Sequence, residues 1–160
     1  MRRFAIDATD RKILAVLQED GRISNQDLAD RIALSPSPCL RRVRQLEQAG
    51  VISNYVALLD PNAVGLGVTA FVRVRLDAQD DAQLARFEAA IAEFSEVMEC
   101  YLMTGDSDYQ IRVLVGSLQE FEDFLRQKVT RLPGVSQVTS SFALRPIVYR
   151  TALPVTDGVG

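Results

Sequence analysis

Histidine and tryptophan are absent from this chain of 160 residues, and cysteine occurs only twice. Without histidine, the protein lacks the side chain that most often moves protons and binds metals near neutral pH. Cys39 and Cys100 do not form a metal-ligand pattern. No nucleophile with a recognisable base, no phosphate loop and no dinucleotide fingerprint is present. The sequence therefore predicts neither an enzyme nor a metal or other cofactor site.

Long apolar runs are also missing. None approaches the roughly 20 residues that a transmembrane helix needs, and the first residues do not resemble a secretory signal. A hydrophobic fraction of 48% with 24% charged residues is ordinary for a globular protein. We therefore expect a cytoplasmic protein with reduced thiols and no membrane partner.

Charge is distributed unevenly along the chain. Residues 1–55 contain nine Arg and Lys against seven Asp and Glu, whereas residues 56–160 contain nine against fourteen. Only the first part favours contact with a phosphate backbone. This asymmetry predicts two domains with different tasks.

The first part contains the pattern of two short helices joined by a tight turn, at residues 24–50. Ser24 and Ser35 each precede a helical pattern, where a hydroxyl can accept from the unpaired amides of the first turn. Pro36 suits the first helical position because its missing N–H is not needed there. Gly50 suits a left-handed cap that ends the second helix.

The second helix separates an apolar face from a polar one. Its apolar stripe consists of Cys39, Val43 and Leu46. The opposite side carries Ser37, Arg41 and Arg44. Such a helix suits the major groove of DNA, although by itself it is equally compatible with a solvated arginine face. Its partner helix and the helical pattern before them favour a helix-turn-helix.

Further signals set the limits of the domains. Asp7 and Asp10 open the first helical pattern, at residues 8–19, as a capping box. Residues 51–58 are rich in strand formers, which predicts a wing beside the helices. We therefore expect a winged helix-turn-helix at residues 1–58 and a linker at 59–67, followed by a domain at 68–150 and a frayed tail at 151–160.

The second domain alternates strand and helix patterns, at residues 67–76, 80–94, 97–104, 109–115, 118–132 and 135–144. The order βαββαβ predicts a ferredoxin-like sandwich, so the whole chain is an α+β protein of two domains. Two helices can cover only one face of such a sheet, and Phe71 falls on the other face. We expect a second copy to bury that face in a two-fold dimer, which would also present two helix-turn-helix units to a pseudo-palindromic site.

Five motifs together resemble one family. They are Asp7-x-x-Asp10-Arg11-Lys12-Ile13-Leu14, Leu34-Ser35-x-Ser37-Pro38-Cys39-x-Arg41-Arg42-Val43-x-x-Leu46-Glu47-x-x-Gly50-Val51-Ile52, Tyr55-x-Ala57-x-Leu59-Asp60, Thr104-Gly105-Asp106-x-Asp108-Tyr109 and Leu132-Pro133-Gly134-Val135. In combination they are similar to the Lrp/AsnC, or feast/famine, transcription regulators of bacteria and archaea. The resemblance implies a DNA-binding protein that forms homodimers through its C-terminal sheets, assembles further into octamers and responds to a small amino-acid effector.

The DNA-binding candidates lie on the second helix of the pair and at its start. They are Ser35, Ser37, Pro38, Leu40, Arg41, Arg42 and Arg44. Arg41 and Arg44 point outward and could contact guanine edges or phosphates. Leu40 is either a contact to a thymine methyl or simply exposed. Arg42 is open between a phosphate contact and a structural ion pair, for which Glu47 is one candidate.

The effector candidates follow from the resemblance, in which the loop around Gly105 and the strand before it line the amino-acid pocket. They are Met103, Thr104, Gly105, Asp106, Asp108 and Tyr109, joined from the facing subunit by Ser136, Gln137, Thr139 and Ser140. Asp106 or Asp108 would receive the ligand's ammonium, and backbone amides near Gly105 would meet its carboxylate. The alternative is that Gly and Asp here only satisfy the geometry of the turn.

The sequence therefore leaves three functions open. The first is a sequence-specific transcription regulator whose assembly or DNA affinity responds to an amino acid or a related metabolite. The second is a ligand-independent octamer of the same family that organises DNA. The third is an enzyme or metabolite sensor without DNA binding, which the missing catalytic groups disfavour.

Overall fold

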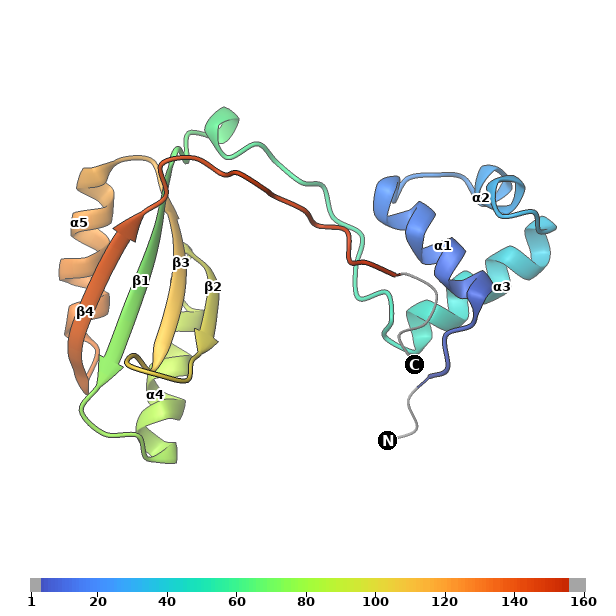
Figure 1. Cartoon of the computed structure of the whole chain (residues 1–160). Helices are drawn as coiled ribbons and strands as arrows, with labels where there is room; N and C mark the ends of the chain where they lie inside the picture. The colour runs from blue at the N-terminus through green and yellow to red at the C-terminus, as the bar shows by residue number, and fades with distance from the viewer. Residues whose placement is uncertain (1–3, 156–160) are drawn as a thin grey trace. The chain divides into compact units, whose positions relative to one another are not determined.

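The computed structural model describes residues 4–155, and its helices and strands form two compact units (Figure 1). The helical unit holds the residues up to Leu58 together with those from Val148 onward, and the sheet unit holds Leu59–Ile147. Residues 1–3 and 156–160, which include the end of the predicted tail, lie outside the described part. Within the described part, no helix has the length and apolar character needed to cross a membrane.

Three helices build the helical unit: α1 (Ala8–Glu19), α2 (Asn25–Arg31) and α3 (Pro36–Gln48). The capping box of α1 is formed, since the Asp7 carboxylate accepts from the Asp10 N–H and the Asp10 carboxylate accepts from the Asp7 N–H. Ser24 caps α2 by accepting from the Asp27 N–H. The hydroxyl of Ser35 makes no such bond at the start of α3, so that part of the expectation is wrong. Pro36 occupies the first turn of α3 instead and removes one of the donors that a cap would satisfy.

A small apolar core joins the three helices. Its buried residues are Ile13, Leu14, Leu28, Ala29, Ile32, Cys39 and Leu46. Gly50 has φ +70° and ends α3 in the left-handed conformation that the sequence predicted. The predicted strand at residues 51–58 is not formed, because this segment pairs with no strand of the described chain; residues 51 and 52 form a bend, and 53–58 have no regular secondary structure. Its large side chains Val56 and Leu58 are exposed.

The sheet unit consists of β1 (Val68–Leu76), α4 (Asp81–Ala92), β2 (Val97–Leu102), β3 (Tyr109–Val115), α5 (Leu118–Gln127) and β4 (Val135–Phe142). The strands pair antiparallel in the order β2-β3-β1-β4. This is the predicted βαββαβ arrangement. Two short 3-10 helices, η1 (Asn62–Val64) and η2 (Val129–Arg131), lie before β1 and before β4.

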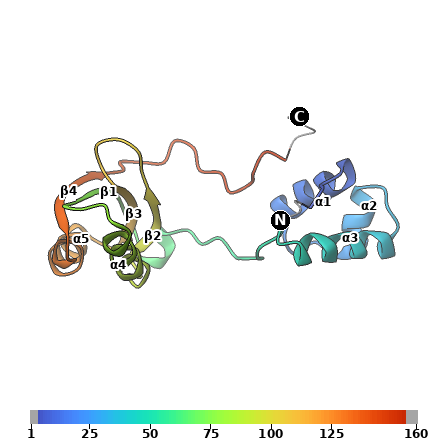
Figure 2. The same ribbon diagram turned by 90° about the horizontal axis from the view of Figure 1, so that it is seen from below.

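The two faces of the sheet differ in what covers them. Helices α4 and α5 lie on the same face (Figure 2). Ala70, Val72 and Val74 point to that face and are fully buried. The side chains between them on β1 are exposed on the opposite face, which no element of the described chain covers; they are Phe71, Arg73 and Arg75. The open face that the sequence predicted is therefore present.

The end of the chain is not a frayed tail as far as it is described. The Gln18 side chain on α1 donates to the Leu153 carbonyl at 3.1 Å and accepts from the Leu153 N–H at 2.6 Å. Val155 packs against the apolar core of the helical unit. Residues 148–150, predicted to belong with the strands, and 151–155, predicted to be tail, therefore return to the helical unit.

The turn between α2 and α3 contains a strained residue that provides a test of this unit. Ala33 has φ +57°, a left-handed conformation that costs an Ala residue about 1 kcal/mol or more. We expect Ala33→Gly to stabilise the helical unit by roughly 0.5–1 kcal/mol, because relief of strain exceeds the gain in unfolded-chain entropy. Urea unfolding of the full chain, with hydrogen exchange of the α1–α3 amides, measures the effect.

Ala15, exposed in the middle of α1, is the matched control. Ala15→Gly should destabilise the same amides by about 1 kcal/mol. A destabilising Ala33→Gly would contradict the left-handed turn.

Candidate functional site

The outward face of α3 presents most of the predicted DNA-binding side chains. Ser35, Ser37, Leu40, Arg41 and Arg44 are exposed, and Pro38 is half-buried. Among the described residues, the guanidinium groups of Arg41 and Arg44 have neither a hydrogen bond nor an ion pair. Cys39 and Leu46 are completely buried behind them and hold the helix to the core. The guanidinium groups are thus held on a packed helix and remain available to a ligand.

Arg42 differs from its neighbours because it is bound within the protein. Its Nη1 lies 2.7 Å from Asp7 Oδ2 and 2.7 Å from Asp10 Oδ1, so a single nitrogen joins α3 to the capping box of α1. The suggested partner Glu47 is wrong, since Glu47 instead accepts a hydrogen bond from the Tyr55 hydroxyl at 3.0 Å. Of the two alternatives for Arg42, the structure contains the ion pair.

This cluster affects the ionisation of its exposed carboxylate. The N–H of Asp10, and next the guanidinium of Arg42, hold the pKa of Asp7 below its usual value of 3.8. A lowered folded-state pKa contributes stability above the unfolded value, and this contribution is lost as the pH falls through the folded pKa. The contribution of Asp7 to the link between α1 and α3 is therefore present near neutral pH and is lost only in acid, below about pH 4.

The β2–β3 loop carries half of the predicted effector residues, and their side chains differ in burial. Gly105 has φ +111°, which an L side chain rarely adopts, so turn geometry requires glycine. Asp108 is buried, and its carboxylate accepts from the Leu76 N–H at 2.6 Å and from the Gln79 side chain at 2.5 Å. Asp108 therefore braces the loop against the segment after β1, whereas the side chain of Asp106 is exposed.

Other members of the predicted set serve the framework of the loop and sheet. The Met103 N–H donates to the Asp108 carbonyl at 2.8 Å and closes the hairpin, and Thr104 is exposed beside it. Ser136 donates to the Arg75 carbonyl at 3.0 Å. Ser140 pairs with the buried Val72 and so belongs to the helix-covered face of the sheet. Met103, Thr104, Ser136 and Ser140 therefore do not gather into one site.

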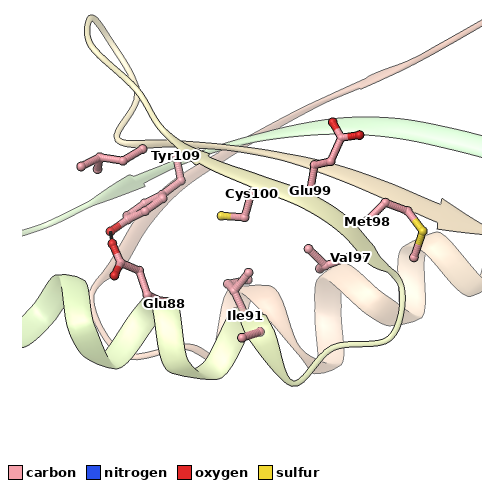
Figure 3. Close-up of a pocket in the computed structure, with 9 residues that line it drawn as sticks. Glu88, Ile91, Val97, Met98, Glu99, Cys100 and Tyr109 are labelled. Carbon is pink, nitrogen blue, oxygen red and sulfur yellow. Dashed lines mark hydrogen bonds between the residues drawn. The ribbon is translucent and has the colours of Figure 1, made fainter. Parts of the chain in front are cut away.

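Tyr109 lines a mainly apolar hollow between α4 and β2, about 330 Å³ in volume (Figure 3). Its hydroxyl donates to Glu88 at 2.7 Å, and burial followed by this carboxylate raises the pKa of Tyr109. Cys100 and Ile91 also point into the space, while Glu99 points away from it. Burial raises the pKa of Cys100 to about 11, which keeps it a thiol. No Lys or Arg lines this hollow.

A second hollow, of about 250 Å³, lies on the open face of the sheet. It is lined by Arg73, Arg75, Asp106, Ser107, Gln137 and Thr139. Register explains the grouping, because Arg73 is paired with Thr139 and Arg75 with Gln137 across β1 and β4. The β2–β3 loop adds Asp106 and Ser107, since the Asp108 N–H is bonded to the Val74 carbonyl of β1. Three predicted effector residues thus meet within one chain, whereas two of them were expected from a facing subunit.

Sequence reasoning missed Arg73, Arg75 and Ser107 as members of this group. The two arginines stand at every second position of a strand pattern, opposite the apolar residues that predict the core. That alternation predicts that both arginine side chains lie on the face of the sheet opposite the core. Their proximity to the β2–β3 loop depends on strand pairing and could not be read from it.

Comparison with known proteins identifies both units. Residues 6–53 match the winged helix-turn-helix DNA-binding domain, and residues 69–153 match the Lrp/AsnC ligand-binding domain. The chain belongs to the Lrp/AsnC family. Members of this family are transcription regulators, so the protein is a DNA-binding transcriptional regulator and not an enzyme.

Individual Lrp/AsnC relatives match nearly the full length. The DNA-binding transcriptional activator DecR of Escherichia coli is 41% identical over 150 residues, covering 94% of this chain and 99% of DecR. The Bkd operon transcriptional regulator of Pseudomonas aeruginosa is 43% identical over 150 residues, covering 94% and 98%. A transcriptional regulator from Neisseria meningitidis, solved as a complex with L-methionine, has a TM-score of 0.90 and 42% identity, covering 94% and 97%.

The Arg42 cluster yields a pH-dependent prediction. In the full chain, Arg42→Gln should raise the pKa of Asp7 toward 3.8, but not fully, because the bond from the Asp10 N–H remains. NMR titration of the side-chain carboxyls measures this change. The pKa of Asp123, lowered by its own partner Arg126, should stay the same. An unchanged Asp7 would show that Arg42 does not contact it in solution.

Proposed function

We propose that this regulator reads duplex DNA with the exposed face of α3 and that a small amino acid, bound on the open face of the sheet, alters its assembly or its affinity for DNA. The availability of Arg41 and Arg44 on a helix fixed by a buried core is the observation that carries the first half. The presence of both cationic and anionic side chains in the hollow on the open face, which Arg73 and Asp106 line, supports the binding of an amino acid there.

The proposed roles of the α3 side chains follow from how far each side chain is exposed to solvent. Arg41 and Arg44 are long, charged and unpaired among the described residues, so either can donate two hydrogen bonds to a guanine edge or neutralise a phosphate. Ser37 lies one position after the start of the helix, where recognition helices meet base edges. Arg42 acts as a positioning residue in this scheme, because its Nη1 bonds hold α3 against α1.

The choice of hollow follows from the chemistry of an amino acid. An α-amino acid carries a carboxylate and an ammonium, so its site needs a cationic group and an anionic group within a few ångströms. The hollow on the open face offers both, in Arg73, Arg75 and Asp106. The hollow between α4 and β2 offers only the carboxylates of Glu88 and Glu99 in its lining. The effector is therefore assigned to the open face.

A second copy of the chain over the open face would bury Phe71 and cover this hollow. Phe71 is 36% exposed although it stands in the middle of β1. On the same face Arg112 is already paired with Glu99 at 2.7 Å, so part of its charge is neutralised before any contact forms. A two-fold homodimer through this face is the proposed basic assembly, and it links occupancy of the hollow to the packing of the two copies.

DNA contact by α3 is tested by removing its free arginines one at a time. Arg41→Ala and Arg44→Ala should each weaken binding to the gene's own upstream DNA by roughly 10- to 100-fold, as expected for loss of one base or phosphate contact of about 1–3 kcal/mol. Gel shifts at several salt concentrations separate the two kinds of contact. Loss of a phosphate contact lowers the salt dependence by about one ion, whereas loss of a base contact relaxes the choice of sequence.

Arg131→Ala, an exposed arginine of the sheet unit, is the control and should leave DNA binding unchanged. If both α3 variants bind as tightly as the parent, α3 is not the reading helix.

Dimerisation through the open face is tested with Phe71→Glu. A carboxylate at this position would be desolvated at the centre of the interface, so the variant should sediment as a monomer at concentrations where the parent is a dimer. Leu118→Glu, which changes a residue 63% exposed at the start of α5, should leave the dimer intact. A dimeric Phe71→Glu protein would place the interface elsewhere.

A further inference from the structure

The open face of the sheet carries more positive charge than its own residues neutralise. Three arginines project from it, namely Arg73 and Arg75 on β1 and Arg112 on β3. Arg112 is paired with Glu99 across to β2. Among the described residues, Arg73 and Arg75 have neither an ion pair nor a hydrogen bond from their guanidinium groups. Both of these line the second hollow.

Within one chain, the lining of the hollow therefore contains two positively charged side chains and one negatively charged side chain. Asp106 is the sole carboxylate in the lining, and its side chain makes no hydrogen bond within the described part of the chain. A neutral zwitterion would satisfy Asp106 and one arginine, and would leave the second guanidinium partly desolvated without a partner. A ligand with one ammonium and two carboxylates would satisfy all three groups.

The uncharged residues that line the hollow also favour a polar, acidic ligand. Ser107, Gln137 and Thr139 are polar, and the hollow contains no aliphatic or aromatic side chain. A leucine or methionine side chain would gain little by entering, because the hydrophobic term needs apolar surface to be removed from water on both sides. The hydroxyls and the amide can instead donate to a carboxylate. A volume of about 250 Å³ suits a ligand no larger than an amino acid.

We infer that the effector of this protein is an acidic amino acid, with its two carboxylates on Arg73 and Arg75 and its ammonium on Asp106. This assignment rests on the proposed function, since it names the ligand class of the hollow already assigned to the effector. Each charged group of the ligand has one counterpart in the protein, so the three groups can be tested separately.

A panel of closely matched ligands on the full-length protein provides the test. Glutamate and aspartate are compared with glutamine and asparagine, which lack the second carboxylate, and with glutarate and succinate, which lack the ammonium. Leucine and methionine represent apolar effectors. Isothermal calorimetry and thermal shift should rank the acidic amino acids first, with the amides and the plain dicarboxylates about 10- to 100-fold weaker, as expected for loss of one charged hydrogen-bonded contact.

Variants of the hollow should change this ranking in specific ways. Arg73→Gln and Arg75→Gln together should remove most of the preference for glutamate over glutamine. Asp106→Asn should remove the preference for glutamate over glutarate. Arg131→Gln, outside the hollow, should change neither. All four residues are exposed, so circular dichroism should show an unchanged fold.

Each outcome decides a separate claim. Binding of leucine or methionine as tight as that of glutamate would overturn the acidic ligand class while leaving an amino-acid effector in place. If no amino acid binds and none changes DNA affinity, the proposed effector response itself fails. A preference for glutamate that survives both sets of variants would show that the ligand occupies another site.

Discussion

The alternation of side chains along β1 is the constraint on which the sheet unit depends. Ala70, Val72 and Val74 must face the helices, because they belong to the apolar core of this unit. The same backbone then has to present Phe71, Arg73 and Arg75 on the opposite face. A single strand thus sets the core, the open face and the charge of the hollow. A shift of one residue in register would exchange all of them.

In the helical unit, an ion pair supplements a small apolar core in holding the helices together. The unit's apolar core is small, with seven buried residues in the described part, and Arg42 joins two of its helices through carboxylates that already cap α1. Asp10 is buried, so its charge needs this partner, while the more exposed Asp7 contributes less. The cost is one arginine on α3 whose charge is already satisfied within the protein.

Local signals in the sequence predicted most of the fold. The helices of both units and the four strands follow from periodicity and from capping residues such as Asp7 and Ser24, which act within a few positions of themselves. What could not be predicted depends on contacts between distant residues. Arg42 meets Asp7 from 35 positions away, Asp108 meets Gln79 from 29 away, and Gln18 meets Leu153 from 135 away. The candidate hollow belongs to the same class, because strand pairing brings Arg75 to Gln137.

Return of residues 148–155 to the helical unit changes how the two units are connected. A domain attached by one linker can swivel freely, because rotation about a single extended chain meets no resistance. Here the sheet unit is an insertion, entered through residues after Leu58 and left through residues before Val148. With Leu153 bonded to Gln18 and Val155 in the core, both ends of the insertion are anchored, and twisting one unit would wind the two connections around each other. Two covalent connections therefore restrict the rotation of one unit relative to the other more than a single linker would.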